Sequence, residues 1–180
     1  MPFSVNSTFD VAFWFSDQAL NENEYLQPQK LHRLLYLAQA HFAVAYEGKK
    51  LMPAIFVADE LGPIEPTIYQ AFTRGRPDVE VELFLPADVE MFLNSIWRRY
   101  GHLDANRLNK ITCNNNAFSI ALRKGKRVEI TLEAMVSAFK DTATKGNPTG
   151  QAIGEKVMVT QDGAPVKVKS WVPGTKPTSQ

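Results

Sequence analysis

Apolar residues recur at helical spacing over most of the chain. A first helix is predicted from five positions that share one face and are apolar except for Ser16: Phe9, Ala12, Phe13, Ser16 and Leu20. The clearest pattern follows Pro28, which suits the first turn of a helix. It is an apolar stripe that extends over four turns and comprises Leu31, Leu34, Leu35, Ala38, Phe42 and Ala45. Gly48 follows this stripe and predicts the end of the second helix.

The next part of the chain changes from helical spacing to shorter patterns. Residues 51–57 are apolar, but their length leaves a strand and a single helical turn both open. A fixed turn is predicted at Gly62-Pro63, because a proline lacks an amide hydrogen and disfavours helix before it. Pro66 then suits the first turn of a short helix that stops at Gly75. Residues 79–85 alternate as a strand does.

Helical spacing returns after Pro86 and continues to Tyr100. Asp104 is predicted to cap the next helix, because its carboxylate can accept from first-turn amides. Residues 114–116 are three asparagines and predict a break before a short helix that contains Phe118. Thr131 is predicted to cap the last helix, which includes Phe139. We expect residues 1–143, a unit of several helices, to be the compact domain.

Residues 144–180 form a tail rich in Gly, Pro, Lys, Ser and Thr. Two segments, 156–160 and 166–171, alternate as strands do, and Asp162-Gly163 between them favours a hairpin turn. A hairpin of two strands is marginal alone in water, so we expect it to dock on the domain, a second copy or a partner. The chain end from Lys176 is expected to fray. The fold class is therefore predicted as mainly α (α+β), with a C-terminal β-hairpin-like tail.

Composition excludes several classes of protein. The 180 residues include 20 Lys or Arg and 19 Asp or Glu, a net charge of +1. Near neutrality argues against a nucleic-acid backbone or an anionic membrane as the main partner. Cys113 is the single cysteine, so no internal disulfide framework exists. With no export signal and no apolar run of about 20 residues, a cytoplasmic location is expected.

The motifs of common enzymes are absent from the sequence, and we expect no catalytic site, no metal and no cofactor. His32 and His41 are nine residues apart, which puts them on opposite faces of one helix and prevents shared metal ligation. Cys113 is predicted to be a buried, inert thiol, because only His102 is near enough in sequence to activate it. A hydrolase using Asp59, Glu60 or Cys113 is the least favoured alternative.

Charged and aromatic residues supply candidate contacts for a protein partner. They are the acidic residues Asp59, Glu60 and Glu65, the basic residues Arg123, Lys124, Lys126 and Arg127, and Trp171 in the tail. The acidic turn and the basic run are expected to be separate local surfaces. Solvated or capping roles are the simpler interpretation of the acids, and favourable interaction with a helix C-terminus is that of the bases. Core packing is expected for Tyr36, Tyr46 and Tyr69.

Two ordered motifs give the sequence a family resemblance. Residues 31–39 read LHRLLYLAQ, and residues 56–66 read FVADELGPIEP, with Ile68-Tyr69 after them. They resemble the signature of the Panacea domain, the SocA-like antitoxin family, over about residues 8–142. The chain departs from the family pattern at His32, Arg33 and Asp59. The positions that match the family signature and serve as its scaffold are Leu31, Leu34, Leu35, Tyr36, Gly62, Pro63, Pro66 and Tyr69.

The resemblance implies an antitoxin that binds and neutralises a cognate protein toxin. Within this family an antitoxin can also be a proteolytic adaptor that delivers its toxin to the ClpXP protease, and the tail is the candidate tether. A homo-oligomer remains open. The alternatives are a nucleic-acid-binding transcriptional regulator that uses residues 123–127 and a phage-associated protein-interaction module.

Overall fold

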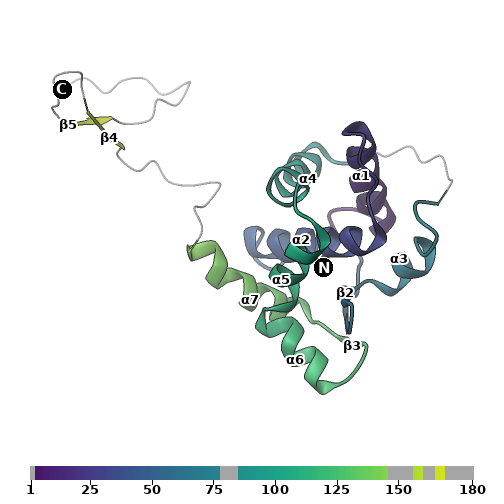
Figure 1. The fold of residues 1–180 in the computed structure, drawn as a ribbon. Helices are drawn as coiled ribbons and strands as arrows, with labels where there is room; N and C mark the ends of the chain where they lie inside the picture. The colour runs from purple at the N-terminus through teal and green to yellow at the C-terminus, as the bar shows by residue number, and fades with distance from the viewer. Residues whose placement is uncertain (1–2, 78–84, 146–155, 160–164, 169–180) are drawn as a thin grey trace. The chain divides into compact units, whose positions relative to one another are not determined.

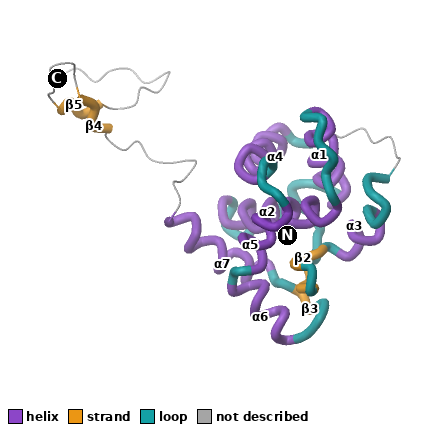
Figure 2. Tube along the Cα trace, in the orientation of Figure 1, coloured by secondary structure: helices purple, strands orange, loops and turns teal. Residues whose placement is uncertain are grey.

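The computed structural model describes residues 3–77, 85–145, 156–159 and 165–168 (Figure 1). The chain divides into two compact units, Met1–Lys145 and Gly146–Gln180. In order along the first unit, the elements are α1 (Thr8–Asn21), α2 (Pro28–Ala45), β1 (Val57–Asp59), β2 (Gly62–Ile64), α3 (Pro66–Ala71), α4 (Ala87–Tyr100), α5 (Ala105–Cys113), α6 (Asn116–Lys124), β3 (Val128–Glu129) and α7 (Leu132–Lys145). The described residues are thus mainly helical with a small sheet, which confirms the predicted fold class (Figure 2).

Helix α2 is the core element of the first unit. It contacts α1, α3, α4, α5, α7 and β2, and every side chain from Lys30 to Ala40 is buried. The apolar stripe that predicted this helix is therefore only part of its buried surface. Because neighbours cover α2 on all sides, the polar residues His32, Arg33 and Gln39 are inside the protein.

Side-chain caps set several helix boundaries where the sequence predicted them. Asp104 Oδ1 accepts from the Arg107 amide at 2.7 Å, and Thr131 Oγ1 accepts from the Ala134 amide at 3.3 Å. Asn115 Oδ1 accepts from the Phe118 amide at 2.9 Å, so the asparagine run separates α5 from α6. Each cap pairs a first-turn amide that has no partner within its own helix.

The three short strands form an antiparallel sheet in the order β2-β1-β3. Asp59 pairs with Gly62, which puts the turn at Glu60-Leu61. The predicted turn at Gly62-Pro63 is therefore two residues too late. Pro63 is tolerated in β2 because this strand lies at the edge of the sheet, where a missing amide breaks no ladder. Strand β3 was not predicted, and it pairs with β1 through Val128 and Ala58.

Two other predictions concern short segments. Residues 51–56 form neither a strand nor a helical turn, and only Val57 of that apolar segment belongs to β1. The predicted strand at 79–85 lies, apart from Leu85, outside the described residues. In the second unit β4 (Lys156–Val159) and β5 (Pro165–Val168) pair antiparallel, as the tail's alternation predicts. The predicted turn at Asp162-Gly163 lies outside the described residues.

Candidate protein-interaction site

The β1–β2 hairpin is attached to the core by Arg33 of α2. This side chain is fully buried, and its Nη1 donates to the Pro63 carbonyl oxygen at 2.8 Å. Its Nε donates to Asn109 Oδ1 of α5 at 2.6 Å. Burial lowers the pKa of Arg33 to about 10, while the nearby Cys113 and Asp59 oppose that shift, so the guanidinium is charged at neutral pH. One buried cation thus joins α2, α5 and β2.

Gln39 attaches the segment before β1 to the same helix. Its Oε1 accepts from the Met52 amide at 3.2 Å, and its Nε2 donates to the Met52 carbonyl oxygen at 3.4 Å. Both groups are buried, so the side-chain amide replaces the partners that a strand would supply. Residues 51–56 are therefore held without regular secondary structure.

The start of α3 is attached to α2 through His32. The Glu65 amide donates to His32 Nδ1 at 3.3 Å, and burial, assisted by the charge of Arg33, lowers the pKa of His32 to about 4. The imidazole is therefore neutral at pH 7. Tyr36, one turn further along α2, packs edge-on against Phe56 with ring centroids 5.4 Å apart. The two motifs at 31–39 and 56–69 thus contact each other along α2.

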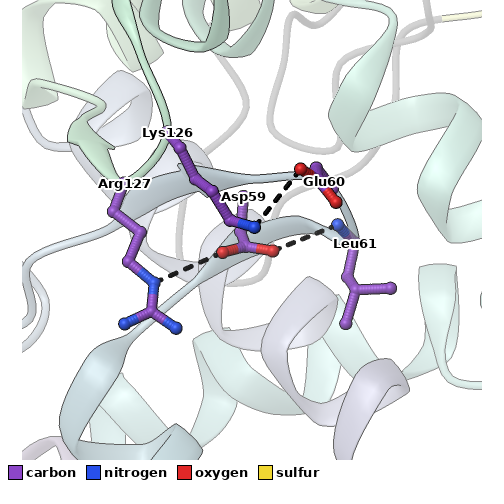
Figure 3. Close-up of polar contacts among 5 residues, drawn as sticks. All are labelled: Asp59, Glu60, Leu61, Lys126 and Arg127. Atoms are coloured by element: carbon purple, nitrogen blue, oxygen red, sulfur yellow. Dashed lines mark hydrogen bonds and ion pairs between the residues drawn. The ribbon is translucent and has the colours of Figure 1, made fainter.

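The turn of the hairpin faces the loop between α6 and β3 (Figure 3). Asp59 Oδ2 is 3.4 Å from Arg127 Nε, and Glu60 Oε1 is 3.2 Å from Lys126 Nζ. Asp59 Oδ1 also accepts from the Leu61 amide at 3.4 Å. The expectation of separate acidic and basic surfaces is therefore wrong, because β1–β3 pairing brings the two segments together.

The acidic candidate contacts have different environments. Glu65 is 5% exposed and caps α3, its Oε2 accepting from the Ile68 amide at 2.6 Å. Burial raises the pKa of Glu65, and the hydrogen bond from Ile68 opposes that rise. Asp59 is 8% exposed, so it too offers a partner little surface. Glu60 is exposed at the turn beside Leu61, which is 59% exposed.

The basic candidates are all exposed, but only two are paired. Lys126 and Arg127 have the ion pairs described above, whereas Arg123 and Lys124 have no ion pair within the described residues. Arg127 has φ of +61°, and its amide donates to the Ala58 carbonyl oxygen at 2.8 Å. The final candidate, Trp171, lies outside the described residues.

The tyrosines and the cysteine match their predicted roles only in part. Tyr36 is fully buried, but Tyr46 and Tyr69 are 36% and 40% exposed. Core packing is therefore the wrong prediction for these two, since their rings lie at the edge of the core, Tyr46 stacked on Phe42 and Tyr69 beside His32. Cys113 is half-buried at the end of α5, with its Sγ 3.8 Å from Thr112 Oγ1.

The scaffold positions of the family signature lie mostly inside the protein. Leu31, Leu34, Leu35, Gly62 and Pro63 are buried, while Pro66 is exposed in the first turn of α3. Within the described ranges, no three His, Cys, Asp or Glu side chains gather as metal ligands would. The described helices also include none whose length and apolar character would suit a membrane span.

No family model, curated protein or solved structure matches this chain. Its function must therefore be argued from its own residues. Sequence reasoning missed Arg33, Gln39 and Asn109, which hold the hairpin and its approach in place. The signal was present in the first motif, where Arg33 and Gln39 interrupt a strongly apolar helix, but such residues ordinarily indicate an exposed face.

Proposed function

We propose that this protein is a cytoplasmic antitoxin of the Panacea type, which binds and neutralises a cognate protein toxin. The proposal rests on the contact between the two motifs that carry the resemblance. Residues 31–39 supply two buried anchors, Gln39, which matches the family signature, and Arg33, where the chain departs from it. Both hold the segment that contains the second motif. Such an arrangement fixes the shape of a surface rather than positioning a set of reacting groups.

The exposed parts of that surface suit binding. Leu61 at the hairpin turn and Tyr69 on α3 present apolar area, and Glu60 and Lys126 lie beside Leu61 with exposed charges. Apolar residues surrounded by polar ones are the usual anatomy of a protein interface. Neutralisation needs only such a surface, because blocking a toxin requires no bond to be made or broken.

The test is co-expression with the neighbouring gene. We expect the product of that gene to stop growth when expressed alone and to be harmless when this chain is expressed with it. The two proteins should also co-purify. A neighbouring gene product that is harmless alone, together with no co-purification, would reject the antitoxin proposal.

A pair of matched variants tests whether neutralisation depends on the hairpin turn and not only on the presence of the chain. Leu61→Asp changes an exposed turn residue and should weaken neutralisation, whereas Met91→Asp changes a residue of α4 that is 70% exposed and should not. Both variants should unfold at temperatures near that of the unaltered protein, since neither side chain is part of the core.

Delivery to ClpXP is a separate part of the proposal. If this chain is a proteolytic adaptor, the toxin's half-life should shorten only when ClpXP and the chain are both present. Truncation after residue 145 should then leave neutralisation intact and abolish delivery, because the tail would be the tether. An unchanged toxin half-life in the full-length case would remove the adaptor role and leave neutralisation standing.

A further inference from the structure

Charge is distributed unevenly along this nearly neutral chain. Residues 1–97 contain six Lys or Arg and thirteen Asp or Glu, whereas residues 98–127 contain eight Lys or Arg and a single Asp. The basic segment extends from the last turn of α4 through α5 and α6 to the loop before β3. A net charge of +1 therefore conceals a strongly cationic part of the first unit.

The cations of α5 and α6 differ from those of the following loop. Arg107, Lys110, Arg123 and Lys124 are exposed, and within the part of the chain that the structure describes they make no ion pair and no side-chain hydrogen bond. Lys126 and Arg127, by contrast, pair with the β1–β2 turn. The four helical cations are therefore available to a partner without any internal contact being broken.

Each of these helices combines cations and an isoleucine on one exposed face. On α5 they are Arg107, Lys110 and Ile111, and on α6 they are Ile120, Arg123 and Lys124. Both sets have i, i+3, i+4 spacing, so each shares one side of its helix. Ile111 is 36% exposed and Ile120 is 50% exposed.

Buried side chains next to these exposed sides attach the two helices to the domain. Leu108 and Thr112 of α5 are buried, as are Ala117, Phe118 and Ala121 of α6. The helices contact each other and follow one another in the chain (Figure 1). Their exposed residues are consequently held by a rigid support, which limits the entropy lost when a partner binds.

We infer that the exposed residues of α5 and α6 contact an acidic surface of a protein partner. We call these six residues the α5–α6 surface: Arg107, Lys110, Ile111, Ile120, Arg123 and Lys124. The inference rests on the proposed function, since that partner is the toxin. It adds a second region of contact besides the hairpin turn, and it adds the charge of the toxin's surface there. Cations would steer the encounter and fix its orientation, and the isoleucines would supply apolar contact area.

A protein partner fits this surface better than a nucleic acid does. A phosphate backbone offers no apolar area to Ile111 and Ile120, and nucleic-acid interfaces are more polar than protein interfaces. An acidic protein can match the isoleucines and the cations together.

The experiment measures binding of the purified full chain to the purified product of the neighbouring gene at several salt concentrations. Two double variants reverse the charges, R107E/K110E on α5 and R123E/K124E on α6. The control K49E/R74E makes the same change in charge at exposed sites outside the basic segment. Milder variants, R107Q/K110Q and R123Q/K124Q, serve if a reversal impairs folding, as judged by thermal unfolding.

We expect each charge-reversed variant to raise Kd by about tenfold or more, chiefly by slowing association, and the control to remain within about twofold. Added salt should weaken binding of the unaltered chain and have less effect on the variants. Replacing an acidic residue of the partner by lysine should restore binding to a charge-reversed variant.

The outcomes separate this inference from the proposed function. Tight binding that all variants retain would overturn the α5–α6 surface and leave the antitoxin proposal intact. No binding by the unaltered chain would reject the antitoxin proposal itself. A 20-base-pair DNA duplex is the competing probe, and if only duplex binding is lost in the variants, the surface binds nucleic acid and the inference is wrong.

Discussion

The Arg33 guanidinium occupies the space where a side chain at Gly62 would lie. A Cβ built on Gly62 would be 2.6 Å from Arg33 Cζ and 2.9 Å from its Nε, distances that real Cβ atoms do not show. Gly62 also has φ of +112°, a conformation that residues with a side chain rarely adopt. The glycine therefore lets the hairpin lie against the buried cation that holds it.

Gly62→Ala should destabilise the protein by about 3 kcal/mol, because backbone strain adds to a clash in a packed region. The control is Gly48→Ala. Gly48 has φ of +85° but no atom within 4 Å of its added Cβ, so the expected loss is only the strain, about 1 kcal/mol. Urea denaturation measures both. Equal losses in the two variants would mean that the contact with Arg33 does not limit position 62.

Gln39→Met should lower stability by about 1–3 kcal/mol, because it leaves the buried amide of Met52 without a partner. The Met52 carbonyl oxygen keeps its hydrogen bond from the Ala54 amide, at 2.9 Å. Methionine has nearly the same size, so little of the loss would come from a cavity. Gln70→Met, at an exposed position of α3, should change stability by less than about 0.5 kcal/mol. Hydrogen exchange should also show the Met52 amide losing protection only in the Gln39 variant.

These anchors indicate how far sequence reasoning reaches. The spacing of Leu31, Leu34 and Leu35 predicts α2, because a helix must bury one face whatever its neighbours are. The burial of Arg33 and Gln39 depends on backbone groups of Pro63 and Met52, whose positions follow from the tertiary fold. No local pattern reports those partners, so two polar residues that hold the hairpin escaped prediction.

The position of the hairpin turn and its ion pairs also depend on the tertiary fold and escape prediction from local sequence. Because proline lacks an amide hydrogen, Pro63 predicts a turn at its own position. An edge strand accepts a proline, however, and the turn lies at Glu60-Leu61 instead. Glu60 and Lys126 are 66 residues apart in the chain, and they meet through the pairing of β1 with β3. That pairing involves only two residues of β3, too few for an alternating pattern to reveal.

Lys126→Ala should leave folding nearly unchanged, with a difference below about 0.5 kcal/mol. The Lys126–Glu60 pair joins side chains that are 58% and 76% exposed, and water screens such a pair strongly. Thermal unfolding in low and in high salt measures the effect, and the small difference should shrink further in high salt. A large loss would show that this pair holds the hairpin, a role that we assign to Arg33.

Acid should destabilise the protein through buried histidines. His41 Nε2 lies 2.7 Å from the Tyr100 hydroxyl, and burial, assisted by the charge of Arg99, lowers the pKa of His41 to about 4. An unfolded chain binds this proton near pH 6.5, so the unfolded state takes up more protons between pH 6.5 and pH 4. Stability is therefore complete above about pH 6.5 and falls as the pH approaches 4.

His32, whose pKa is also lowered to about 4, acts in the same direction, while the raised pKa of Glu65 opposes it. Each histidine should contribute on the order of 3 kcal/mol of lost stability by pH 4. Urea denaturation from pH 4.5 to 7.5 measures the slope.

His41→Gln should flatten this dependence, because glutamine can still hydrogen-bond to Tyr100 but gains no proton. His102→Gln, at an exposed ring, should leave the curve as it is in the unaltered protein. If the curve for His41→Gln is as steep as that of the unaltered protein, protonation of the His41 ring is not the cause. The acid sensitivity would then have to arise from His32 at the α2–α3 contact, where the neutral imidazole accepts from the Glu65 amide.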